Sequence, residues 1–358
     1  MSNEPRVGGD DENAGKTPLA ILFGCAGETL SAAERAFFTE TDPLGFILFQ
    51  RNCREPAQVR ALVAEMRAAV GRADAPVLID QEGGRVARLK PPHWRRYPAP
   101  AQLAALSEAE EAVRLGARLI ADDLAALGVT VDCLPVLDLL VAGADGVIGD
   151  RAYGGEPALV APLGRAACEG LLAGGVLPVM KHIPGHGRAR VDSHRELPVV
   201  DADAELLAAT DFAPFRALAE LPQGAMWAMT AHVVYAAIDG GRPATLSPAV
   251  IDGVIRGAMG FGGVLVSDDI GMGALAGTIG ELVAGALAAG CDLVLQCSGK
   301  LDEMREAAAA ASAMTPAALA RVARGEVLRL GSRQAFDRRE AEARFDRMVG
   351  ALMEPGVR

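Results

Sequence analysis

Residues 175–185 read GVLPVMKHIPG, an apolar run that ends in a lysine, a histidine and a Pro-Gly turn signal. A short, near-continuous apolar run with charged and turn residues at its end is typical of a strand in a parallel sheet that is covered on both faces. Seven further runs of this kind occur, at 19–27, 45–50, 75–84, 129–139, 225–235, 262–269 and 291–297. The sequence therefore predicts eight strands of the same type.

Segments rich in Ala, Leu, Glu and Arg lie between these runs and have the apolar spacing of amphipathic helices, as in LSEAEEAVRLGARLIADDLAALG at 106–128. Eight strands that alternate with helices predict an α/β chain whose sheet closes into a (β/α)8 barrel, or TIM barrel, as a single domain. The alternative is an open doubly wound sheet. However, FGCAGETLS after the first run lacks the G-x-G-x-x-G fingerprint of many such folds.

The two ends of the chain depart from the alternating pattern. Residues 1–17 are polar and acidic, and we expect them to form a disordered lead. The barrel is expected over residues 18–335, with a closing pair of helices after residue 300. Residues 336–358 predict one further amphipathic helix as a C-terminal tail. No linker between these parts suggests a second domain.

Composition limits the classes of partner. The 358-residue chain has a formal net charge of −11, whereas proteins that bind nucleic acids need clustered Lys and Arg. We therefore expect a small-molecule ligand and no nucleic acid. The six cysteines form no CxxC pair, which suits a reducing compartment. No apolar run reaches the roughly 18 residues that span a bilayer, and the start shows no secretory signal, so we expect a cytoplasmic protein with no membrane partner. We also expect a monomer.

Charged and imidazole side chains gather where the expected strands end, which is where barrel enzymes carry their active sites. They are Asp80 and Arg88 after the third run, Arg151 after the fourth, Lys181 and His182 after the fifth, His232 after the sixth, and Asp268 and Asp269 at the end of the seventh. Bringing such groups together away from water is costly unless they bind a polar ligand. A sugar fits, because its hydroxyls both donate and accept hydrogen bonds. The alternative is that these carboxylates and arginines only pair with one another.

The segment KHIPGHGRARVDSHREL at 181–197 holds three of the five histidines. One interpretation is a zinc site formed by His182, His186, Asp192 and His194. The glycine-rich, basic loop between these residues would repel a cation, so proton transfer is the interpretation we favour. Asp192 and His194 lie two residues apart, and in an extended segment the carboxylate would hold the imidazole in one tautomer. A solvated loop histidine is the alternative for His194.

Three motifs, IDQEGGRVARL, KHIPGHGRARVDSHREL and VLVSDDIGMGAL, resemble those of glycoside hydrolase family 3. Over roughly residues 18–335 the chain is most similar to the single-domain bacterial β-N-acetylglucosaminidases of cell-wall recycling. The resemblance implies Asp268 as the nucleophile, although the pattern alone does not choose between Asp268 and Asp269. It implies His194 as the acid/base and Asp192 as the residue that orients it. It also implies a sugar-binding set of Asp80, Arg88, Arg151, Lys181 and His182, and a loop-shaping role for His186.

The resemblance implies a retaining exo-β-N-acetylglucosaminidase that cleaves terminal GlcNAc from muropeptides of the GlcNAc-anhydroMurNAc type, with neither cofactor nor metal. A family 3 β-glucosidase is one alternative, but it would use a carboxyl acid from a second domain, for which we see no segment. A sugar-binding barrel without activity and a metal-dependent hydrolase are further alternatives.

Overall fold

The structure is a computed structural model that describes residues 17–219 and 226–353. The expected lead over 1–17 thus lies outside the described residues except for its last position, as do residues 354–358 of the expected tail. In the described part, eight parallel strands form a closed barrel in the order β1-β13-β12-β9-β7-β6-β3-β2. The predicted (β/α)8 barrel is confirmed.

Each barrel strand overlaps one of the eight predicted runs. The strands are β1 (Leu19–Phe23), β2 (Pro43–Leu48), β3 (Val77–Ile79), β6 (Val131–Asp132), β7 (Leu177–Ile183), β9 (Trp227–Thr230), β12 (Val264–Asp269) and β13 (Leu293–Gln296). Short strands in the loops add a hairpin of β4 (Gln81–Gly83) and β5 (Val86–Ala87), and a small sheet of β8 (Val199–Val200), β10 (Val234–Tyr235) and β11 (Asp239–Pro243). These loop strands lie outside the barrel sheet.

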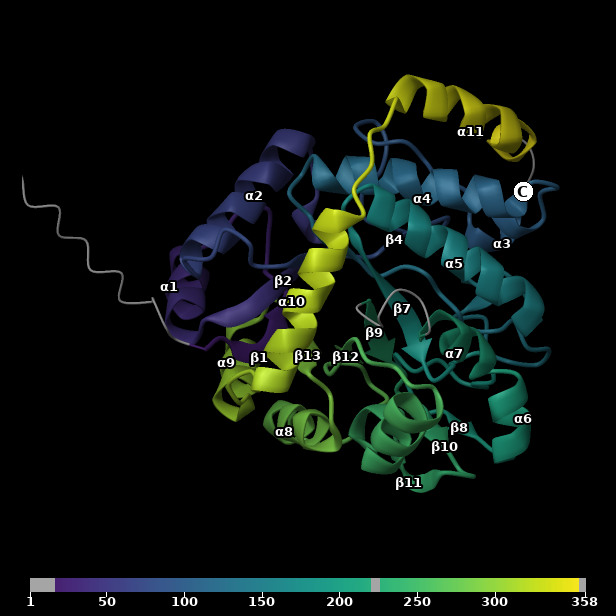
Figure 1. The fold of residues 1–358 in the computed structure, drawn as a ribbon. Helices are drawn as coiled ribbons and strands as arrows, with labels where there is room; N and C mark the ends of the chain where they lie inside the picture. Colours follow the sequence, from purple (N-terminus) through teal and green to yellow (C-terminus); the bar gives the residue numbers. More distant parts are fainter. Residues whose placement is uncertain (1–16, 220–225, 354–358) are drawn as a thin grey trace, which may run out of the picture.

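Helices surround the barrel (Figure 1), and local sequence signals set several of their first residues. Ser31 and Thr278 form capping boxes with Glu34 and Glu281. A proline begins four of the helices, at a position where its missing N–H removes no intrahelical hydrogen bond. The helices are α1 (Ala32–Thr41), α2 (Pro56–Ala69), α3 (Pro100–Ala104), α4 (Ala109–Ala125), α5 (Pro157–Ala173), α6 (Ala204–Ala209), α7 (Ala213–Ala219), a π-helix (Ala249–Ala258), α8 (Ile279–Ala289), α9 (Leu301–Ala310), α10 (Pro316–Gly331) and α11 (Arg338–Met353).

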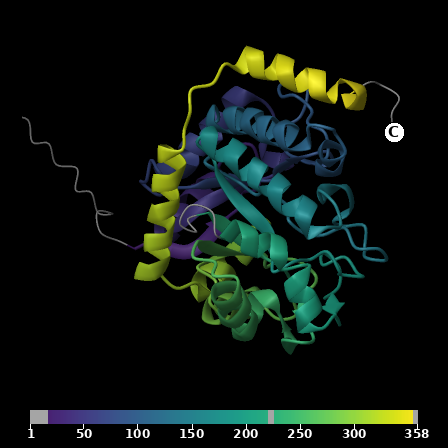
Figure 2. The same cartoon turned by 45° about the vertical axis from the view of Figure 1, so that its right-hand side comes forward.

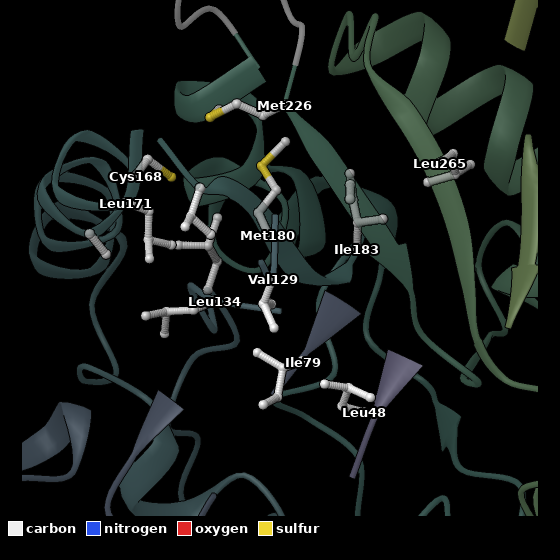
Figure 3. Close-up of a cluster of buried hydrophobic side chains, with 14 of the residues drawn as sticks. Leu48, Ile79, Val129, Leu134, Cys168, Leu171, Met180, Ile183, Met226 and Leu265 are labelled. Atoms are coloured by element: carbon white, nitrogen blue, oxygen red, sulfur yellow. The ribbon is translucent and has the colours of Figure 1, made fainter. Parts of the chain in front are cut away.

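The core has two layers because successive side chains of a strand point to opposite faces. On β1, Ile21 and Phe23 belong to the larger cluster, which lies between the sheet and the helices, while Leu22 belongs to a second cluster inside the barrel. Figure 3 shows part of the larger cluster, where Leu171 of α5 points toward Met180 of β7. The sheet is therefore buried on both faces, as its apolar runs predict.

Two C-terminal helices complete the molecule. Ala318 of α10 packs into the inner cluster, and the Met314 amide donates to the carbonyl oxygen of Pro18 just before β1, so α10 closes the end of the barrel where the strands begin. Helix α11 lies against α4 on the outside (Figures 1 and 2). Its buried Phe345 ring packs on Gly116, where an added Cβ would come within 3.0 Å of the ring.

All six cysteines are buried and unpaired, as expected for thiols that pack as small apolar groups. Within residues 17–219 and 226–353, no helix is long and apolar enough to cross a membrane.

Candidate active site

The alternation of side chains along the strands brings charged groups to the mouth of the barrel. Val266 of β12 belongs to the inner cluster, so Asp268, two residues further on, faces the same side. Asp80 and Lys181 follow inner-cluster residues of β3 and β7 at the same spacing. Three strands that are far apart in sequence thus direct charged side chains to one place.

A cavity of about 370 Å³ opens at this end of the barrel. Seven of the eight site residues expected from the sequence line it, namely Asp80, Arg88, Arg151, Lys181, His182, His194 and Asp268. The eighth, Asp192, does not line the cavity but contacts His194. The structure therefore brings the whole predicted set together.

Lys181 is the centre of a buried charge network. Its ammonium lies 2.7 Å from both Asp80 Oδ1 and Glu82 Oε1. Arg88 lies 3.0 Å from the other oxygen of Asp80, and Arg151 binds Glu82 through two nitrogens at 2.8 and 2.9 Å. Burial alone would raise the pKa of each carboxyl group, but the adjacent cations hold both pKa values below their ordinary range. Both carboxylates are therefore ionised and held in fixed positions.

Glu82 was not among the residues singled out from the sequence, although it stands within IDQEGGRVARL. Its side chain is fully buried, and its two oxygens join Lys181 to Arg151. The available signal was its position two residues after Asp80, because this spacing puts both side chains on one face of an extended segment.

His182 is oriented by Asp138, a second residue that sequence reasoning missed. Asp138 Oδ2 lies 2.6 Å from His182 Nδ1, and Asp138 Oδ1 accepts the backbone amide of His186 at 2.6 Å. Burial favours the neutral form of Asp138, but His182 and these hydrogen bonds lower its pKa below the usual value. With Nδ1 bound, Nε2 is the nitrogen that His182 retains for a ligand in the cavity. The available signal was a carboxylate near the end of the fourth apolar run, which also holds Asp132.

Asp268 and Asp269 differ in their surroundings. Burial alone would raise the pKa of Asp268, but the fields of His182, His232 and Lys181 and the backbone amide of Asp269 lower it below its ordinary value. Asp269 instead directs Oδ1 to the backbone amides of Gly271 and Cys297, and burial leaves its pKa raised. Asp268 thus combines an ionised carboxylate with a position among cationic and imidazole groups, which suits a nucleophile.

Asp192 and His194 form a close pair, but not in the extended segment we expected. Residues 193–195 form a turn, in which Asp192 Oδ1 accepts both the backbone amide of His194 at 2.9 Å and its ring nitrogen Nδ1 at 2.8 Å. The expectation of an extended segment was wrong because an aspartate side chain readily accepts a hydrogen bond from the amide two residues on, which folds the chain into a turn. The predicted pairing nevertheless exists in this geometry.

The loop that carries His194 is attached to the barrel at several points. His186 is buried, has its pKa lowered to about 4 chiefly by burial, and places Nε2 2.9 Å from Ser193 Oγ. The backbone amides of Gly273 and Ala274 donate to the carbonyl oxygens of His194 and Ser193. The His194 side chain is 61% exposed at the edge of the cavity, and no described residue is hydrogen-bonded to its Nε2.

The zinc interpretation requires a compact cluster of ligands. In the described part of the chain, no group of three or more His, Cys, Asp or Glu side chains could hold a metal ion. His182 and His186 each bond other side chains of the loop and barrel.

The family follows from comparison with known proteins. Residues 26–326 match the glycosyl hydrolase family 3 N-terminal domain. The chain belongs to glycosyl hydrolase family 3. This family 3 chain is 40% identical over 285 residues to a β-hexosaminidase of Alkalilimnicola ehrlichii, covering 78% of this chain and 80% of that protein.

Solved structures agree with this assignment. Native NagZ from Neisseria gonorrhoeae is 32% identical, with a TM-score of 0.82 over 95% of this chain and 99% of that chain. The same Neisseria protein in complex with N-trifluoroacetyl-D-glucosamine is 31% identical, with a TM-score of 0.81 over 94% and 99% of the two chains. The family 3 chain is thus a glycoside hydrolase, and the cavity at the strand ends is where its barrel would bind a sugar.

Proposed function

We propose that this family 3 enzyme is a retaining exo-β-N-acetylglucosaminidase. The observation that carries the proposal is the meeting of an ionised Asp268 and the Asp192–His194 pair at one cavity lined with fixed hydrogen-bonding groups. Its similarity to β-hexosaminidases and to a protein crystallised with a glucosamine derivative supports the choice of sugar.

In the first chemical step, a carboxylate oxygen of Asp268 attacks the anomeric carbon, and the bond from that carbon to the leaving oxygen breaks. His194 gives its proton to the leaving oxygen. In the second step, neutral His194 takes a proton from water, whose oxygen attacks the anomeric carbon and releases Asp268. Two displacements retain the configuration of the sugar. Imidazole suits both roles because it exchanges protons near neutral pH, and Asp192 fixes its tautomer.

The charge network around Lys181 supports a role in holding the sugar hydroxyls. Asp80 accepts hydrogen bonds, Lys181 and Arg88 donate them, and the ion pairs fix their positions before the sugar arrives. Groups held in position in advance lose little entropy on binding. Arg151 and His182 complete the proposed binding set.

We further propose that the natural substrates are muropeptides with a terminal GlcNAc, cleaved in the cytoplasm during cell-wall recycling by a monomeric enzyme. Similarity to NagZ supports this finer proposal. The cavity volume of about 370 Å³ lies near the small end of the range for ligand pockets, which suits one terminal sugar rather than a long chain.

The first test is sugar selectivity. We expect the p-nitrophenyl β-glycoside of GlcNAc to be hydrolysed with a kcat/KM at least about 100-fold above that of the β-glucoside. Under the proposed function the site binds the acetamido group, and a site that hydrogen-bonds a substrate group rejects an analogue that lacks it. Release of p-nitrophenol measures both rates. Preference for glucose would favour the β-glucosidase alternative, and binding without turnover would favour a silent sugar-binding barrel.

The second test concerns His194. His194→Ala should lower kcat/KM about 100-fold or more for a natural sugar leaving group, because such an alkoxide needs a proton. The loss should be smaller for p-nitrophenol, which leaves without one, and the pH dependence of the first step should flatten. His93→Ala is the matched control, since His93 is exposed and lies outside the cavity. Equal losses with both leaving groups would contradict the acid role.

A further inference from the structure

A second cavity, of about 520 Å³, lies beside the sugar cavity and shares Arg85 with it. The loop that follows the β4–β5 hairpin forms most of its wall, and Leu352 of α11 contributes from the C-terminal helix. We call this second cavity the basic groove, because its lining includes Arg85, Lys90, Arg95 and Arg96.

The charge of the basic groove is unusual for this chain. Four cations and no Asp or Glu are present among the described residues that line it, although the whole protein has a net charge of −11. Lys90 and Arg96 are exposed, and neither side chain has an ion-pair or hydrogen-bond partner in the described part of the chain. Two cationic groups thus face the groove without a counter-charge.

The other two cations are held in position. Arg95 pairs with Asp346 of α11 and lies over the rings of Tyr97 and Phe345, at 5.6 and 5.2 Å from their centroids. This contact fixes the wall of the basic groove against α11. The Arg95 Nε atom is buried and has no hydrogen-bond partner among the residues that the structure describes.

Arg85 connects the basic groove to the sugar cavity. Its Nε lies 2.8 Å from Asp150 Oδ1, and its Nη2 donates to the carbonyl oxygens of Val147 and Ile148 at 2.6 and 3.1 Å. These bonds hold the guanidinium at the rim of the sugar cavity, where Val147 also contributes to the lining. Arg85 therefore stands at the border between the sugar cavity and the basic groove.

We propose that the basic groove receives carboxylates on the leaving part of the substrate, so that the enzyme prefers N-acetylglucosaminides whose aglycone is anionic. This inference rests on the proposed glycosidase function and adds the chemistry of the aglycone. A peptide with free carboxylates is such an aglycone. Complementary charge around a partly exposed groove adds modest affinity and faster association, and it selects against neutral or cationic aglycones.

The test compares three substrates. They are p-nitrophenyl β-GlcNAc, a GlcNAc-anhydroMurNAc peptide with free carboxylates, and the same compound with its carboxylates amidated. For the wild type at low salt, we expect kcat/KM to be roughly three- to tenfold higher for the acidic peptide than for the amidated one, on the scale of one or two exposed ion pairs. In the double variant Lys90→Gln/Arg96→Gln, this ratio should fall to about one.

A charge-matched control separates the basic groove from the overall field of the protein. Arg60 and Arg333 are exposed and line other cavities, so Arg60→Gln/Arg333→Gln removes the same charge elsewhere. This control should keep the wild-type ratio. A ratio near one in the wild type, or an equal fall in both double variants, would overturn the proposal. If the wild type hydrolyses p-nitrophenyl β-GlcNAc normally in that case, the groove inference fails alone. If no GlcNAc glycoside is hydrolysed, the proposed function fails and the groove inference with it.

Discussion

Asp268→Asn is expected to reduce turnover of p-nitrophenyl β-GlcNAc by about 10⁴-fold or more, because an amide cannot form the covalent glycosyl-enzyme. The carboxylate of Asp268 has a lowered pKa, so it is ionised throughout the neutral range. In the wild type, loss of activity through its protonation should therefore begin only below about pH 4, the ordinary range of an aspartate. Steady-state rates from pH 3 to 9 measure both effects.

Asp269→Asn is the matched control for that experiment. Asp269 uses Oδ1 to accept the backbone amides of Gly271 and Cys297, and an asparagine can keep both hydrogen bonds. We expect this variant to retain most of its activity. Mass spectrometry after trapping with a slow fluorinated GlcNAc donor should find the sugar on Asp268. A label on Asp269, or a larger loss in Asp269→Asn, would reverse the assignment.

The fold was predictable because of the way barrel strands are buried. A strand covered on both faces must be apolar at nearly every position, and this leaves a strong pattern even in a strand as short as β3 (Val77–Ile79). The expected closing helices also form, as α9 and α10. The domain boundaries at residues 18 and 335 stay a prediction.

The site was predictable where a residue stands at or near the end of a strand, and less so where its function depends on a partner side chain. Asp80 and Lys181 were evident from their positions at strand ends. Asp138 and Glu82 were missed because they act on other side chains, and only the folded barrel brings them within hydrogen-bonding distance. The choice of Asp268 over Asp269 likewise depended on side chains that are distant in sequence, such as His182 and Lys181. The roles of these residues in catalysis stay proposals.

Lys181→Met is expected to destabilise the protein by about 3 kcal/mol at pH 7, in addition to abolishing sugar binding. Methionine can fill the volume of the buried side chain, so the loss in free energy of unfolding comes from leaving Asp80 and Glu82 without their shared cation. The expected loss lies at the low end for a broken buried ion pair, because each carboxylate keeps an arginine. Urea unfolding measures the difference, and Lys300→Met, which removes an exposed pair with Glu303, should cost less than about 1 kcal/mol.

The pH dependence of that difference tests its electrostatic origin. In the wild type, the folded pKa values of Asp80 and Glu82 lie below their ordinary values near 4, so the stability they contribute is complete above that pH and is lost as the pH falls toward the folded pKa values. Without Lys181, both folded pKa values rise and this contribution shrinks. The difference in free energy of unfolding between wild type and Lys181→Met should therefore be largest at neutral pH and should decrease below about pH 4. A difference in free energy of unfolding that stays constant from pH 7 to pH 3 would mean that Lys181 stabilises the barrel through packing. The buried charge network would then contribute to sugar binding and not to the stability of the fold.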